Sequence, residues 1–172
     1  MNSNYWFSIA ELTIKLIFKE DGLNNLSLLP SFSPFEIAEP SKEDNLFELT
    51  IDDKTAPIAK SERVRIKTID TGNGNIIVDQ TNDGRHQFII KDINGNSCCL
   101  LIANKEFSVC QCALNGNYDM RSFGLNNAIM IAYAFASSKY NTLLIHASLV
   151  RQNGYGYAFI AKSGTGKSTQ VS

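Results

Sequence analysis

The chain has 172 residues, of which 44% are hydrophobic and 19% are charged, and its formal net charge is −1. This length suffices for one hydrophobic core with a small additional lobe. The balanced charge argues against nucleic acid or an anionic lipid surface as a partner.

Two apolar segments are too interrupted or too short to be targeting or membrane segments. The segment 5–18 contains Glu11 and Lys15 and has no basic leader. The run 128–136 is far shorter than the roughly 20 residues of a membrane-spanning helix. We therefore expect a cytoplasmic protein without a membrane partner.

The first third of the chain predicts strands joined by an irregular connection. Residues 10–19 place an apolar side chain at every even position, which is typical of a half-buried strand. Three prolines between 28 and 41 then favour an extended, irregular connection. A second strand is expected over 46–51, with Asp52, Asp53 and Lys54 as its turn.

The middle third predicts an antiparallel meander. Short β-prone runs alternate with Gly-Asn-Gly, Asn-Asp-Gly and Asn-Gly-Asn turns, which favour positive φ and tight hairpins. His86 lies on a strand flank, where we expect a surface or edge position rather than a ligand. The strands are expected over 64–69, 76–79, 86–91, 97–102 and 107–114.

Four cysteines lie in two close pairs within these strands, at 98, 99, 110 and 112. A zinc site prefers pairs separated by two to four residues, usually on turns. Inside apolar strand patterns a thiol acts as a small hydrophobic group. We therefore predict buried, reduced thiols, with a metal site or a disulfide as the alternatives.

The apolar period changes to three and four residues over 122–139, which predicts a helix. Ser122 is its expected N-cap. Because apolar residues occur on several sides, the helix is expected to be buried on most of them. Strands over 143–150 and 155–161 follow, joined by a turn at Asn153 and Gly154.

The segment 161–168, Ala-Lys-Ser-Gly-Thr-Gly-Lys-Ser, fits the phosphate-binding loop with Ala in place of the usual first Gly. Successive backbone N–H groups around two glycines can surround a phosphate. Lys167 would contact the β- and γ-phosphates, Ser168 would bind Mg²⁺, and the helix opening at Thr169 would direct its positive end to the phosphates. The expected nucleotide-binding residues are Ser163, Gly164, Thr165, Gly166, Lys167, Ser168 and Thr169.

His146 interrupts the otherwise apolar run 143–150. Taken alone, a histidine in such a run is a satisfied core or edge residue. The tight turn at Asn153, however, pairs its strand with the strand that leads into the loop, so its imidazole could lie beside the bound phosphates. His146 and Lys167 are therefore the candidate catalytic residues.

These residues resemble the superfamily of HPr kinase/phosphorylase and ATP-dependent phosphoenolpyruvate carboxykinase. The run Ile-His-Ala-Ser-Leu-Val at 145–150 looks like the histidine strand of HPr kinases, and Ser-Gly-Thr-Gly-Lys-Ser-Thr at 163–169 is similar to the carboxykinase loop. The resemblance covers about 143–169. It implies ATP and Mg²⁺ (or Mn²⁺) as cofactors and a hydroxyl-bearing acceptor: a protein, a peptide or a small molecule.

The resemblance leaves two roles open for His146. In the HPr kinase-like interpretation it assists the acceptor hydroxyl, and in the carboxykinase-like interpretation it helps to hold the metal. Lys162 departs from HPr kinases, which tend to have an acidic residue there, and the chain is far shorter than a carboxykinase. The families' acidic catalytic residues lie beyond the loop helix, so we expect the chain up to Ser172 to be a truncated form with weak nucleotide binding and little or no turnover.

The overall expectation is a β-rich α+β protein: an antiparallel meander or sandwich-like sheet, one buried helix, and a hairpin leading into the loop. We expect a β-rich region over 1–121 and an incomplete nucleotide-binding core over 122–172. The function expected first is the N-terminal fragment of an HPr kinase-like kinase. The alternatives are a carboxykinase-like enzyme and a non-catalytic binding or assembly module with a vestigial loop. Self-association is also expected, because apolar strand faces would be left uncovered.

Overall fold

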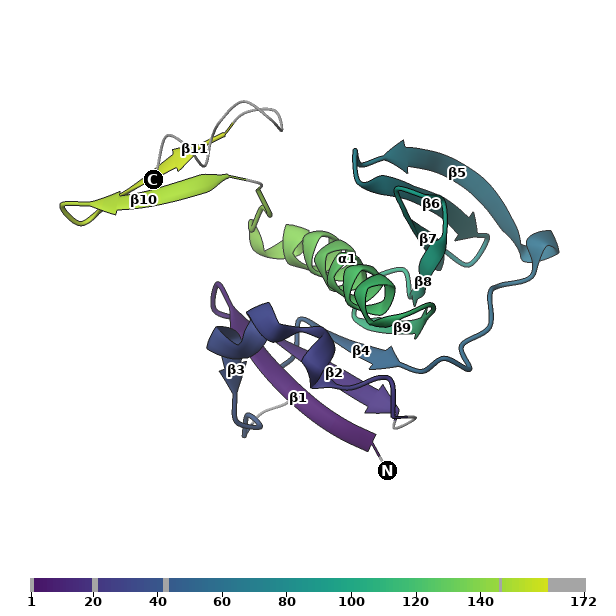
Figure 1. Cartoon of the computed structure of the whole chain (residues 1–172), viewed down its shortest axis with the longest axis horizontal. Helices are drawn as coiled ribbons and strands as arrows, with labels where there is room; N and C mark the ends of the chain where they lie inside the picture. Colours follow the sequence, from purple (N-terminus) through teal and green to yellow (C-terminus); the bar gives the residue numbers. More distant parts are fainter. Residues whose placement is uncertain (1, 20–21, 42–43, 146, 161–172) are drawn as a thin grey trace. The chain divides into compact units, whose positions relative to one another are not determined.

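The computed structural model describes residues 2–19, 22–41, 44–145 and 147–160. The chain divides into two compact units, Met1–Asn141 and Thr142–Ser172, and each is described by itself. Figure 1 shows the elements of both. The first unit contains a large sheet and the helix α1, and the described part of the second unit is a two-stranded hairpin.

The first unit is built on one nine-stranded sheet in the order β3-β1-β2-β4-β9-β8-β7-β6-β5. Its strands are β1 (Asn2–Ile9), β2 (Leu12–Lys19), β3 (Glu36–Ile37), β4 (Phe47–Ile51), β5 (Arg63–Asp70), β6 (Gly74–Thr81), β7 (His86–Asp92), β8 (Ser97–Ala103) and β9 (Val109–Leu114). Short 3-10 helices lie in the connections: η1 (Leu26–Leu28), η2 (Pro30–Phe35) and η3 (Lys60–Glu62).

The predicted antiparallel meander is confirmed for β5 to β9, which pair in sequence order. The sheet as a whole is mixed, however, because β4 lies parallel both to β2 and to β9. Among the described residues of this unit the strands form a single sheet, so the sandwich-like arrangement is wrong. A connection of irregular chain between β2 and β4 makes the parallel pairing possible, since parallel strands need a crossover.

The β1–β2 hairpin is the element that the sequence did not reveal. Its turn is formed by Ala10 and Glu11, at φ values of 49° and 68°. Two central residues with positive φ define the type I′ turn that suits the twist of a hairpin. Such a turn favours Asn or Gly, so an Ala-Glu pair gives no signal for it.

The helix α1 (Tyr118–Ser137) lies across one face of the sheet (Figure 1) and packs on β7, β8, β9 and β4. It begins four residues before the predicted start. Asn117 is the N-cap, and its side-chain oxygen accepts a hydrogen bond from the Met120 N–H at 3.1 Å. Ser122 is inside the helix and donates instead to the Leu28 carbonyl at 2.8 Å.

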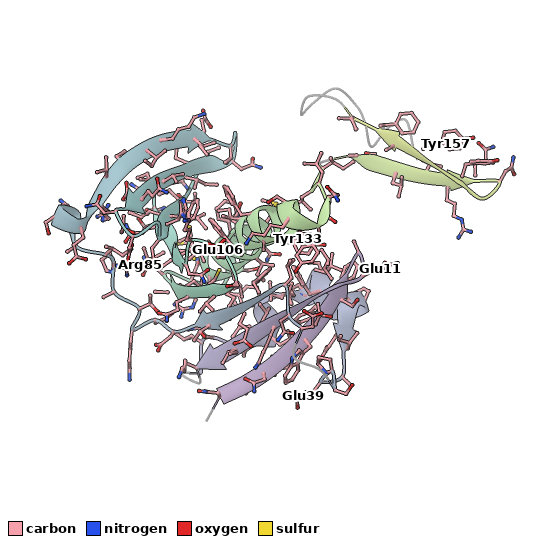
Figure 2. The ribbon with its side chains drawn as sticks, turned by 180° about the vertical axis from the view of Figure 1, so that it is seen from behind. Glu11, Glu39, Arg85, Glu106, Tyr133 and Tyr157 are labelled. Atoms are coloured by element: carbon pink, nitrogen blue, oxygen red, sulfur yellow. The ribbon has the colours of Figure 1, made fainter. Side chains whose placement is uncertain are left out.

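Two contacts fix the helix on the sheet. Gly124 lies so close to β8 that an added Cβ would be 2.8 Å from the Cys98 carbonyl oxygen. At the other end, the Tyr133 hydroxyl donates to the Ile9 carbonyl at 2.9 Å, beside the turn that contains Glu11 (Figure 2). The inner face of the helix is buried with the sheet residues Leu49, Ile90, Leu101 and Cys112, among others.

The outer face of α1 is exposed in the first unit, which corrects the expectation of a helix buried on most sides. Met130 is 48% exposed and Phe135 is 51% exposed. The prediction followed from the rule that a helix with apolar residues on all sides is normally buried on all sides, and α1 departs from this rule at Met130 and Phe135.

The second unit contains the hairpin of β10 (Ser148–Gln152) and β11 (Tyr155–Phe159). Asn153 and Gly154 form its turn, with φ values of 51° and 85°. This confirms the predicted hairpin and its Asn-Gly turn. The strand expected over 143–150 is shorter than predicted, because β10 begins only at Ser148.

Candidate functional site

The residues of the predicted phosphate site lie outside the described residues. This applies to the loop residues Ser163, Gly164, Thr165, Gly166, Lys167, Ser168 and Thr169, and also to His146. The structure describes the elements that flank these residues in the chain.

The hairpin is the described element nearest to both parts of the predicted site. Ser148, the first residue of β10, pairs with Phe159, the last residue of β11. In sequence, His146 precedes Ser148 by two positions and the loop begins two positions after Phe159. Both segments therefore join the hairpin at its open end.

The hairpin is apolar without a core of its own. Leu149 is 71% exposed, Tyr157 is 49% exposed and Phe159 is 41% exposed. A two-stranded hairpin is at best marginally stable in water, and stability needs further strands or a helix on its apolar face.

In the first unit, a buried ion-pair network joins the start of α1 to three other segments. Arg121 is buried and donates to the Leu114 carbonyl at 3.2 Å, to Asn24 Oδ1 at 2.9 Å and to the Asp53 carboxylate. Asp53 also accepts from Asn24 Nδ2 and from the Leu114 N–H, each at 2.9 Å. Partial burial raises the pKa of Asp53, but these hydrogen bonds and the guanidinium outweigh it and hold the pKa below its ordinary value of 3.8. The predicted turn at Asp53 is thus also a structural anchor.

A second polar cluster attaches the β4–β5 connection to the sheet. The carboxylate of Asp79 is buried and binds both Arg63 and Arg65. Gln87 Nε2 donates to Asp79 at 3.3 Å, and Gln87 Oε1 accepts from the Ile58 N–H at 2.8 Å. Arg63 Nε completes the cluster by donating to the Ile58 carbonyl at 2.8 Å.

The β4–β5 connection, which the Asp79 cluster attaches to the sheet, borders a pocket of about 650 Å³. Pockets of 300–1,000 Å³ are the usual size for small-molecule sites. Its lining combines charged and amide side chains with apolar ones, so it offers both hydrogen bonding and hydrophobic contact. The lining includes Lys54, Thr55, Pro57, Glu62, Arg85, Ile102, Val109 and Gln111.

Sequence reasoning missed this pocket because it depends on residues distant in the chain. Lys54 belongs to a turn, Arg85 to a hairpin end and Gln111 to a strand. No local motif brings them together, so the sequence pattern gives no signal for the pocket. Arg85 is in addition paired with Asp83 at 2.8 Å.

His86 is the first residue of β7 and is half-exposed, so it lies at a strand end as expected, although β7 is an inner strand and not an edge strand of the sheet. Its ring is 5.1 Å from that of Phe107, and Phe107 stacks on Phe135 of α1 at 4.5 Å. Burial lowers the pKa of His86 below its ordinary value of 6.5, because the charged imidazolium is poorly solvated there. Nδ1 of His86 is buried without a hydrogen-bond partner among the described residues. The environment is that of a neutral packing residue.

The four cysteines are free and buried, as predicted. Burial raises the pKa of Cys110 to about 12, and the pKa of Cys112 is also raised, by its hydrogen bond with Cys99 and by burial. Thiols in this state are poor metal ligands and nucleophiles, since both roles need the thiolate.

Within residues 2–19, 22–41, 44–145 and 147–160 no three His, Cys, Asp or Glu side chains come together as a metal site. No helix of these segments is long and apolar enough to span a membrane. No protein-family model matches the chain, and neither a curated protein nor a solved structure is similar enough to count as a match.

Proposed function

We propose that the chain carries the nucleotide-binding loop of an ATP-dependent kinase of the HPr kinase-like type. The observation that carries this proposal is the phosphate-loop sequence 161–168, which follows the strand β11 by two residues. The preceding strand β10 begins two residues after His146. ATP is the proposed nucleotide, and the acceptor is a hydroxyl of a protein, a peptide or a small molecule.

The chemistry of the proposed residues follows from the charge of the nucleotide. The Lys167 ammonium and the backbone N–H groups around Gly164 and Gly166 would hold the β- and γ-phosphates, and Ser168 would ligate Mg²⁺. The metal supplies charge neutralisation at the transferred phosphoryl group. His146 would accept the proton of the acceptor hydroxyl, or hold the metal in the carboxykinase-like alternative.

The proposal is tested by ATP binding rather than by turnover, because binding reports on the loop residues directly, whereas turnover also needs the acceptor. Titration calorimetry with ATP in the presence of Mg²⁺ should give saturable binding, and Lys167→Ala should reduce the affinity at least tenfold. Arg151→Ala is the matched control, since it removes an exposed cation from the hairpin strand β10. Equal ATP affinity of Lys167→Ala and the parent chain would mean that 161–168 is not a phosphate loop.

The role of His146 needs a separate assay. If the histidine assists the acceptor, His146→Ala lowers phosphoryl transfer much more than ATP affinity, whereas loss of a metal-holding histidine lowers affinity for the metal–nucleotide complex as well. A dependence on Mn²⁺ and on a carboxylated substrate would favour the carboxykinase-like alternative. If His146→Ala changes neither the rate of phosphoryl transfer nor the affinity for the metal–nucleotide complex, His146 is a packing residue.

A non-catalytic binding module is the second candidate, and the pocket beside the β4–β5 connection favours it. The pocket lies entirely within the first unit and uses none of the predicted loop residues. Absence of ATP binding, together with a ligand whose affinity falls in Gln111→Trp, would support this alternative. Gln111 is exposed and lines the pocket, so an indole there should fill the pocket without disturbing the core.

A further inference from the structure

The connection between β4 and β5 presents backbone groups that the fold leaves unused. Figure 1 shows it as an extended segment, and Ala59 has the extended φ and ψ values of −56° and 142°. Ile58 is held to the sheet by Gln87 and Arg63. Among the described residues, by contrast, the N–H groups of Ala56 and Ala59 have no hydrogen-bond partner. Both residues are exposed and line the pocket, so they offer two backbone donors to a ligand.

The charged side chains around the pocket leave one cation and one anion without an ion-pair partner. Asp52 accepts the Lys54 N–H of its own turn at 2.9 Å, and Arg85 is paired with Asp83. Within the part of the chain that the structure describes, the Lys54 ammonium and the Glu62 carboxylate form no ion pair. Lys54 precedes the segment 55–59 and Glu62 follows it, so opposite charges lie at its two ends.

The sheet side of the pocket adds an amide and an apolar surface. Gln111 is exposed on β9, and its carboxamide makes no hydrogen bond to any described residue. A carboxamide both donates and accepts, as a peptide group does. Val109 is 55% exposed and lies beside Ile102 in the lining, so an apolar side chain of a ligand has a surface to contact.

We propose that this pocket binds a short peptide with free termini and an apolar side chain, antiparallel to the segment 55–59. The inference rests on the second candidate function, a binding module, and names its ligand class; it does not depend on the ATP assignment. Lys54 binds the terminal carboxylate of the peptide and Glu62 binds its terminal ammonium. A ligand with both charges suits this lining, whereas the carboxylates of Asp52 and Glu62 repel a nucleotide.

The length of the segment sets the size of the peptide. Residues 55–59 span at most about 14 Å, which is the length of about four extended residues. The N–H groups of Ala56 and Ala59 donate to carbonyls of the peptide, and the Gln111 carboxamide binds one of its peptide groups. A tetrapeptide is therefore the expected ligand.

Amide NMR titration of the parent chain tests the peptide assignment, because it detects weak binding and reports on each backbone N–H. The probe is a set of four tetrapeptides with free termini, made of alanine with one leucine at each position in turn. At least one of them should shift the Ala56 and Ala59 amide signals in a saturable way, and Gln111→Trp should remove this response. If none of the four does so, the peptide assignment is overturned.

A small-molecule fragment library, titrated in the same way, separates that failure from failure of the binding module itself. A fragment that binds the parent chain and not Gln111→Trp would leave the pocket as a binding site and reject only the peptide. If no fragment and no tetrapeptide distinguishes the two chains, both the binding module and its peptide ligand are rejected.

Blocking each peptide terminus tests the two charges separately. Acetylation of the N-terminus and amidation of the C-terminus should each weaken binding about two- to fivefold, as for an exposed ion pair. In Lys54→Gln amidation should no longer matter while acetylation still does, and in Glu62→Gln the reverse should hold. Lys19→Gln is the control, since it removes an exposed cation of β2 that does not line the pocket. Equal affinity of the free and blocked peptides for the parent chain would contradict the assigned termini.

Discussion

Arg121→Met is the substitution that tests most directly how the first unit is held together. The side chain of Arg121 is 6% exposed, and its guanidinium binds Asp53, Asn24 and the Leu114 carbonyl. Methionine keeps much of the packing volume and removes all three hydrogen bonds. The segments that lose their connection are the start of α1, the end of β9, the turn after β4 and the chain before η1.

The expected loss follows from the acceptors left behind. Asn24 is 3% exposed and loses the hydrogen bond from the guanidinium, and a hydrogen bond to a charged group contributes about 1.5–3 kcal/mol. Breaking a fully buried ion pair costs about 3–5 kcal/mol. The Asp53 side chain is 30% exposed and can recover part of its solvation, so we expect the free energy of unfolding to fall by about 3 kcal/mol.

The assay is urea unfolding followed by the fluorescence of Trp6, which is the only tryptophan and is buried in β1. Asp53→Asn should lower the free energy of unfolding by less than Arg121→Met does. The double variant should lose less than the sum of the two single losses, because both residues belong to one network. Arg85→Met is the control, since it breaks only an exposed pair and should leave the urea midpoint unchanged. A loss below about 1 kcal/mol for Arg121→Met would refute the anchoring role assigned to this network.

Three further predictions concern the same unit. Because the pKa of Asp53 is lower in the folded state, its carboxylate adds to the free energy of unfolding above about pH 4, and this stabilisation is lost as the pH falls through the folded pKa. The urea midpoint measured at decreasing pH should therefore fall, and it should fall less in Asp53→Asn. Gly124→Ala should destabilise by about 1–3 kcal/mol despite the higher helix propensity of alanine, since its Cβ would lie 2.8 Å from the Cys98 carbonyl oxygen; a melting temperature equal to or above that of the parent chain would contradict the close packing. The native chain should not react with a thiol reagent at pH 8 within minutes, and four thiols should react after unfolding, because burial raises the pKa of Cys110 to about 12; fast labelling of the folded chain would show that the thiols are accessible.

The sequence predicted those strands and turns well whose position depends on one turn type or one hydrophobic period. The Asn153-Gly154 turn and the Gly-containing turns of the β5–β8 meander have positive φ at the expected residues. The same rule did not find the β1–β2 hairpin, because Ala10 and Glu11 adopt positive φ without a side chain that favours it. Their conformation is imposed by the pairing of eight residues on each side and by the core residues of both strands.

The relation between distant segments could not be predicted from periodicity. Nothing in Phe47–Ile51 indicates that its neighbours are β2 and β9, since a parallel partner is selected by the whole sheet. The Arg121 network and the pocket near Lys54 combine residues from separate segments in the same way. The phosphate loop is the opposite case, because its glycines and lysine form a contiguous motif, and its function stays a prediction.

The position of β4 has a consequence for how the first unit folds. The β1–β2 hairpin and the β5–β9 meander join neighbouring segments of the chain, so little loop entropy is lost when they form. β4 connects these two parts, and its pairing with β9, through Leu49 and Cys110, spans the entire meander in sequence. High contact order slows the step that makes such a contact. We therefore expect the pairing of β4 with β2 and β9 to be the slowest step in the folding of this sheet. The β1–β2 hairpin and the β5–β9 meander form independently before β4 joins them.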